Sequence, residues 1–144
     1  METQNFRNHT RLVPSYHFVL WVVALAIDIL AIIDLISAIK TERDLLEPLM
    51  FVLIAIALSV GSILMRRFPL IAQDRTIRAE ENLRHFVLTG KLLDSRLSLP
   101  QIIALRFAQD NEFTDLAERA VTENLSSRDI KKAIRQWKAD YYRV

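Results

Sequence analysis

Two aspartates stand out because each lies inside a long apolar stretch. Asp28 falls near the middle of FVLWVVALAIDILAIIDLISAI, residues 18–39, and Asp34 lies nearer its end. An ionised carboxylate in the hydrocarbon core of a bilayer costs roughly 3 kcal/mol or more, so such a group usually has a partner or a function. On a helix the six-residue spacing separates the two carboxylates by about 120°. They therefore cannot share one narrow proton path along a single helix face.

The apolar stretches contain no Lys or Arg that would neutralise Asp28. We expect it to be protonated, to bond Ser59 or Ser62 in the second apolar stretch, or to face a polar cavity between subunits. His17 lies about three helical turns before Asp28 and returns to nearly the same face, which would make a polar stripe. Two hypotheses follow: a hydrogen bond that fixes helix assembly, which we favour, and passage of protons or cations.

Motifs for catalysis and metal binding are weak. The chain has no cysteine, which excludes thiolate nucleophiles and thiolate metal sites. It contains no HExxH, no GxSxG and no glycine-rich phosphate loop. Arg78 and His85 fit the loose R-x6-H spacing of some helical ribonucleases, but the polar residue that usually follows the arginine is missing. We predict no catalytic residue, no metal and no cofactor.

The intramembrane candidates require two long helices to position them. Residues 18–39 would give a helix of roughly 33 Å, enough to cross a bilayer core. The second stretch, PLMFVLIAIALSVGSILM at residues 48–65, is near the lower length limit for a span. Neither stretch shows the polar face of a soluble helix. Because the connecting turn, residues 40–47, is short, we predict an antiparallel transmembrane hairpin.

The charges that flank the hairpin predict its orientation. The turn at 40–47 combines Lys40 and Arg43 with acidic residues, whereas arginines flank the other ends of the two stretches: Arg7, Arg11, Arg66, Arg67, Arg75 and Arg78. Lys and Arg are retained on the cytoplasmic side of a membrane. We therefore expect both termini in the cytosol, with residues 1–17 as an N-terminal arm.

Small residues in the second stretch predict close helix packing. Ala57 and Gly61 make a small-xxx-small pair, which lets membrane helices approach closely. The partner would be the first helix or a second subunit.

Residues 66–144 predict a cytosolic domain of about four helices, so the fold class is all-α. The first helix, at about 69–89, ends at Gly90 as a C-cap, and it either stands alone or continues the second span with a bend at Pro69. The second follows Ser98, and the third buries one face around Phe113. The fourth begins at Ser126 and would bury Ile130, Ile134, Trp137 and Tyr141 on one face.

The other face of that fourth helix is basic, with Lys131, Lys132, Arg135 and Lys138. Together with Arg66 and Arg67 beside the membrane, this face would be solvated, bind anionic lipid, or bind RNA or an acidic partner. The net charge of +2 gives no argument for nucleic acid as a partner.

Four segments together resemble an uncharacterised family of small bacterial membrane proteins. They are QNFRNH (4–9), LTGKLLD (88–94), QIIALRFAQDNEF (101–113) and IKKAIRQWKADYYRV (130–144), which contain a QN-[FY]-x-NH motif and a W-x-x-D-Y-x-R-V ending. The resemblance implies two transmembrane helices, a C-terminal helical domain and a bacterial source. It implies no catalytic residue.

The sequence thus favours a membrane-anchored interaction protein of the bacterial inner membrane, one that forms homo-oligomers and has no enzymatic activity. An oligomer that conducts ions or protons through Asp28 is the alternative. A membrane-tethered enzyme or nucleic-acid-binding effector is the third hypothesis.

Overall fold

A computed structural model describes residues 4–6, 8 and 12–140. Within these residues every regular element is a helix, which confirms the all-α class. The chain divides into two compact units. We call residues 12–68 the hairpin unit, and residues 1–11 together with 69–144 the helical domain.

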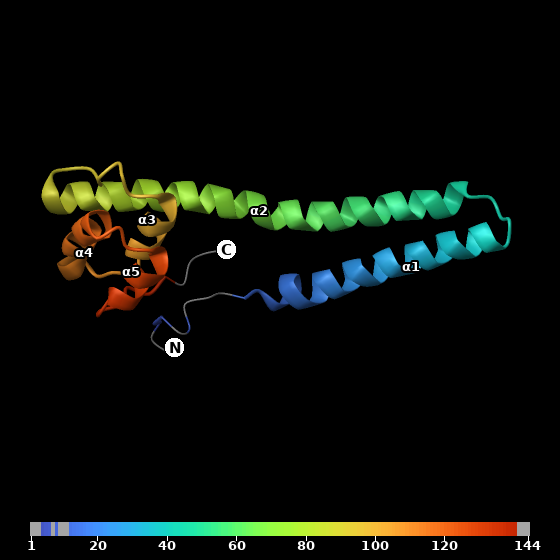
Figure 1. Ribbon diagram of the computed structural model, residues 1–144, viewed down its shortest axis with the longest axis horizontal. Coiled ribbons are helices and arrows are strands. Elements are labelled where there is room, and N and C mark those ends of the chain that lie inside the picture. The colour runs from blue at the N-terminus through green and yellow to red at the C-terminus, as the bar shows by residue number, and fades with distance from the viewer. Residues whose placement is uncertain (1–3, 7, 9–11, 141–144) are drawn as a thin grey trace. The chain divides into compact units, whose positions relative to one another are not determined.

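The hairpin unit contains two antiparallel apolar helices (Figure 1). A six-residue π-helix, η1 (Ser15–Leu20), leads into α1 (Trp21–Lys40), and α2 (Leu46–Thr89) follows a short turn. Both helices are long and apolar enough to cross a membrane. Only 11% and 17% of their most apolar windows are buried, whereas the core helix of a soluble protein is mostly buried. The hairpin therefore leaves most of its apolar side chains uncovered.

The two helices meet along a seam of small residues that recur every seventh position. Its buried members are Ala24, Ala31 and Ala38 on α1, and Pro48, Ala55 and Ser62 on α2. This is the repeat that keeps one helix face against its partner, and small side chains allow the backbones to approach. The two helices therefore pack against each other while burying little apolar surface.

The small-residue pair predicted from the sequence lies outside this seam. Ala57 is exposed, and a Cβ added at Gly61 would meet nothing within 4 Å. Ala55 and Ser62 pack the hairpin instead. A contact of Ala57 and Gly61 with a second subunit stays a prediction.

The second apolar helix continues far beyond the predicted span. α2 has 44 residues and passes through Pro69 into the helical domain. It ends at Thr89, where Gly90 adopts a φ of 73° and donates its N–H to the Phe86 carbonyl at 2.8 Å. Gly90 is thus the predicted C-cap, because glycine takes this left-handed conformation without a steric penalty.

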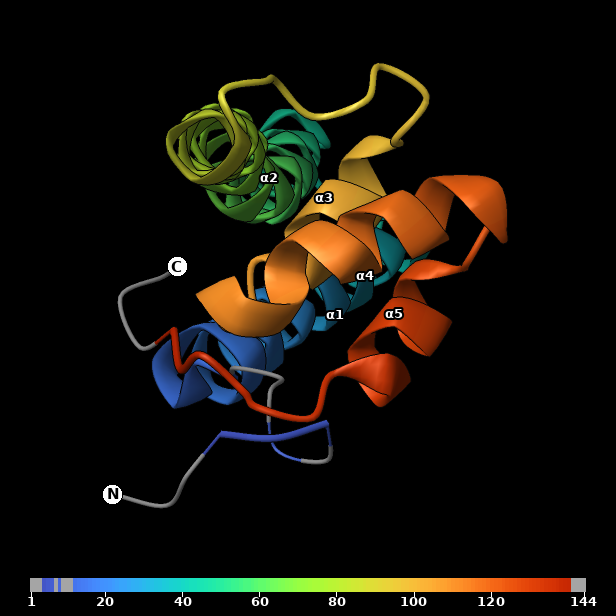
Figure 2. The same ribbon diagram turned by 90° about the vertical axis from the view of Figure 1, so that its left-hand side faces the viewer.

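Three short helices pack together after the loop that follows α2 (Figure 2). They are α3 (Leu99–Leu105), α4 (Asp110–Thr122) and α5 (Ser127–Ala133). Ser98 and Gln101 form a capping box at α3, and the Ser126 hydroxyl accepts the Asp129 N–H at α5, as their positions predict. The core contains four large, fully buried side chains: Leu105, Phe107, Phe113 and Ile130.

The predicted fourth helix is wrong beyond Ala133. α5 ends there, and Ile134 takes an extended backbone with ψ of 122°. The Glu112 carboxylate accepts the N–H groups of Arg135 at 3.1 Å and Gln136 at 3.0 Å, so these donors do not need a helical partner. Trp137 then pairs with Ala108 in an isolated antiparallel bridge. Tyr141 lies outside the described residues.

Candidate functional site

Asp28 is held inside the hairpin by Ser59. The Ser59 hydroxyl donates to Oδ2 of Asp28 at 2.8 Å, and both side chains are partly buried at the seam. Ser62, the other candidate partner, instead donates its hydroxyl to the carbonyl oxygen of Ser59 at 2.7 Å. The carboxylate therefore has a partner within its own chain.

These bonds belong to a longer polar ladder, which we define as Asp28, Ser59, Ser62 and Tyr16. The Tyr16 hydroxyl donates to the Ser62 carbonyl oxygen at 2.9 Å, and the guanidinium of Arg66 lies 5.8 Å from the Tyr16 ring centroid. Two of the three links end on backbone carbonyls, which accept hydrogen bonds but carry no proton to pass on. The ladder ties α2 to η1 and α1 and does not form a continuous proton wire.

His17 takes no part in this ladder. Its Nδ1 lies 3.0 Å from the Val13 carbonyl oxygen and 3.1 Å from the Val13 amide nitrogen. The wider π-helical turn at Ser15–Leu20 alters the register on which the predicted stripe with Asp28 depends.

Asp34 has a different partner from Asp28. Its carboxylate pairs with the Arg43 guanidinium at 2.8 Å, and both side chains are well exposed. The pair links the end of α1 to the turn before α2, and the sequence pattern did not predict it.

The helical domain contains a charged cluster around Arg84 of α2. This guanidinium bonds the Glu81 carboxylate at 3.0 Å, the Asp110 carboxylate at 2.6 Å and the Ala108 carbonyl at 2.7 Å, and it lies 4.2 Å from the Phe113 ring centroid. Burial raises the pKa of the Glu81 carboxyl, and the hydrogen bond and charge of Arg84 oppose that rise. Arg84 thus anchors α2 to the start of α4.

Gln4 and Asp140, which come from the first and last of the four segments that resemble the family, contact one another in the helical domain. Gln4 is buried, and its side-chain oxygen accepts the N–H of Asp140 at 2.8 Å. The Asp140 carboxylate in turn pairs with Arg106 at 3.4 Å. These contacts link Gln4 to the segment that follows α5.

The four basic residues do not share one helix face, because α5 ends at Ala133, before Arg135 and Lys138. Lys131 lies on α5 with its Nζ 5.8 Å from the Phe107 ring centroid, and the Lys138 amide donates to the Phe107 carbonyl at 2.7 Å. Lys132 and Arg135 line a hollow of about 510 Å³ together with acidic residues of α4, Glu112 and Asp115. The local charge is mixed. Arg67 is exposed, so its predicted contact with lipid stays open.

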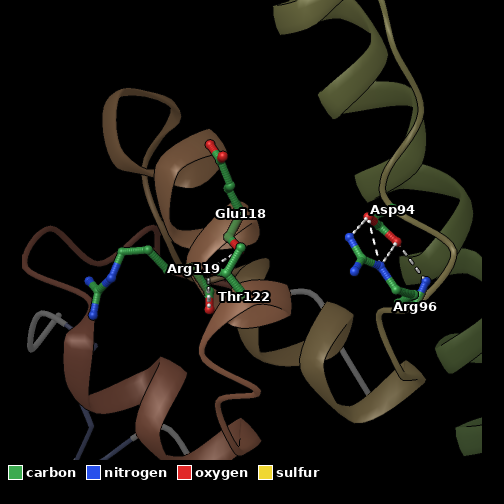
Figure 3. Close-up of polar contacts among 5 residues, drawn as sticks. All are labelled: Asp94, Arg96, Glu118, Arg119 and Thr122. Carbon is green, nitrogen blue, oxygen red and sulfur yellow. Dashed lines mark hydrogen bonds and ion pairs between the residues drawn. The ribbon is translucent and has the colours of Figure 1, made fainter.

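A second groove, of about 530 Å³, lies between helix α4 and the loop that follows α2. Figure 3 shows the Asp94 and Arg96 pair on the loop and Glu118 and Thr122 on α4, all of which line the groove. The Arg96 guanidinium, 2.7 Å from Asp94, and the Arg96 N–H lower the pKa of the Asp94 carboxyl to about 2.

Among the described residues, no group of three His, Cys, Asp or Glu could hold a metal ion.

Comparison with known proteins identifies a family. The model of a family of unknown function, DUF6526, matches residues 1–144, so the chain belongs to that family. No curated protein and no solved structure matches the chain.

Proposed function

We propose that this member of DUF6526 is a membrane-anchored interaction protein that self-assembles in the bacterial inner membrane. The observation that carries the proposal is the exposed apolar surface of the hairpin unit, where most side chains of both helices have no protein cover. Lipid would cover that surface, since exposed apolar patches of this size are rare on soluble monomers. A pair of helices closed by small residues also leaves its outer faces free for neighbouring subunits.

A location of both termini in the cytosol has its own support. Gln4 and Asp140 contact one another, so the segments before and after the hairpin lie on the same side of any membrane that the hairpin crosses. The arginines at 66, 67, 75 and 78 favour the cytosolic side. Arg67, exposed beside the apolar part of α2, is suited to contact anionic lipid.

The polar ladder supports a structural role for Asp28 over conduction. Its hydrogen bond to Ser59 satisfies the carboxyl group inside the hairpin, and the links beyond Ser59 pass through backbone carbonyls. A buried polar group with a partner stabilises one helix pairing over others. The interaction function would then belong to the helical domain and to the outer faces of the helices.

Extraction of bacterial membranes at alkaline pH tests the anchoring. The full chain should stay in the membrane pellet, and single cysteines placed at Thr41 and at Ser95 should react with a membrane-impermeant maleimide from opposite sides. Release of the chain into the supernatant, or labelling of both positions from the same side, would contradict the proposal.

A further inference from the structure

The part of α2 inside the helical domain has two unlike faces. One face is buried against the domain and includes Ile77 and Glu81, each 6% exposed. On the opposite face, about half a turn away, Leu83 is 62% exposed, Phe86 49% and Val87 75%. A helix on the surface of a globular domain normally presents polar residues there. This outward face instead carries three large apolar side chains within residues 83–87.

The outward face follows the spacing of a coiled-coil seam. Ala72, Thr76, Ala79, Leu83 and Phe86 alternate steps of four and three residues, and all five are exposed. We call these residues the outward stripe. Such a repeat is the pattern that packs one helix along another, with the two large side chains at its far end. Among the described residues, none covers the stripe.

Charged residues flank the outward stripe on its two sides. Arg75 precedes Thr76 on one side, and Glu80 follows Ala79 on the other. Both are exposed, and among the described residues neither takes part in an ion pair that the structure shows. In a parallel helix pair, residues at these flanking positions face each other across the seam when they are five apart. Arg75 of one chain would therefore meet Glu80 of the other.

We propose that the outward stripe of α2 binds the same stripe of a second copy of this chain, as a parallel two-helix seam with reciprocal Arg75–Glu80 pairs. This inference rests on the proposed self-assembly and assigns it a surface. The parallel direction follows because two copies inserted in one membrane have the same orientation. The charge pairing favours a second copy over a lipid surface, because lipid would offer the Glu80 carboxylate no cation in register with it.

Disulfide cross-linking tests the seam in membranes, because the chain has no cysteine of its own. Single variants Ala72→Cys and Ala79→Cys should give about tenfold more linked dimer than Arg78→Cys, since a disulfide needs Cα atoms within about 7 Å. Arg78 is an exposed neighbour on a different face of the helix, so it controls for random collision. Equal cross-linking at all three positions would overturn the proposed seam.

Charge reversal tests the pairing. Glu80→Lys should reduce cross-linking of Ala79→Cys severalfold, and addition of Arg75→Glu should restore it, because the reversed charges again attract. A double variant as weak as the single variant would overturn the parallel register.

The mass of the detergent-solubilised chain separates this inference from the proposed function. An oligomer without cross-links at Ala72→Cys or Ala79→Cys would retain self-assembly but overturn the outward stripe as its surface. A monomer would overturn both. Protection of Ala79→Cys from a soluble maleimide without cross-linking would assign the stripe to another partner and likewise overturn the inference.

Discussion

At the scale of single residues, most of the unusual polar groups have partners in their own chain. Asp28 bonds Ser59, Asp34 pairs with Arg43, and Arg84 binds two carboxylates. The sequence predicted that Asp28 needs a partner and named Ser59 as one of two serines. The sequence could not predict the ion pair between Arg84 and Asp110, because nothing in the local pattern shows that these two residues, far apart along the chain, lie side by side.

Removal of the Arg84 guanidinium should destabilise the helical domain. Arg84→Met leaves the buried Glu81 carboxylate without its cation, and the loss of one partner from a buried pair costs about 3 kcal/mol. The pKa of Glu81 should rise further, since the hydrogen bond and charge of Arg84 would no longer oppose the effect of burial. Thermal unfolding of the full chain in detergent measures the loss. The control Arg78→Met, at an exposed position, should unfold as the unmodified chain does.

The Asp94 carboxyl should titrate with a pKa of about 2, below its ordinary 3.8. Because this pKa is lowered in the folded state, the contribution of Asp94 to stability is present above about pH 4 and is lost as the pH falls toward 2. NMR titration of the carboxyl carbon measures the value, and Arg96→Ala should return it toward 3.8. An unchanged value in Arg96→Ala would contradict the assigned cause.

At the scale of elements, apolar periodicity and capping residues predicted the helices well. The Ser98, Ser126 and Gly90 caps lie where the sequence placed them. The end of α5 was missed because side-chain bonds from Glu112, on another helix, replace the helical bonds after Ala133. The seventh-residue repeat of alanines in α1 could have indicated the hairpin seam. The small-xxx-small pattern instead predicted close packing at Ala57 and Gly61, which lie outside the seam.

A larger side chain at the hairpin seam should separate α1 from α2. Ala55 is 2% exposed, so Ala55→Leu forces extra volume between the helices and should cost about 1–3 kcal/mol. Ala57→Leu adds the same volume on the exposed side of the same helix and should not separate α1 from α2. Thermal unfolding in detergent compares the two variants. Equal destabilisation by both would contradict the seam.

At the scale of the whole molecule, the chain belongs to a family of unknown function and its regular elements within the described residues are all helices, as the sequence predicted. Two helices long and apolar enough to cross a membrane are present, and the N-terminal and C-terminal motifs meet through Gln4 and Asp140. The contact between Gln4 and Asp140 could not be predicted from the sequence, because a contact between residues so far apart along the chain depends on the complete fold. The proposed assembly would bring the outward stripes of α2 together.

The mass of the full chain in a mild detergent tests the central proposal most directly. Light scattering coupled to size-exclusion chromatography, corrected for bound detergent, should give a whole-number multiple of the chain mass, at least two, over a tenfold range of protein concentration. A mass of one chain across that range would contradict the account of a self-assembling membrane protein.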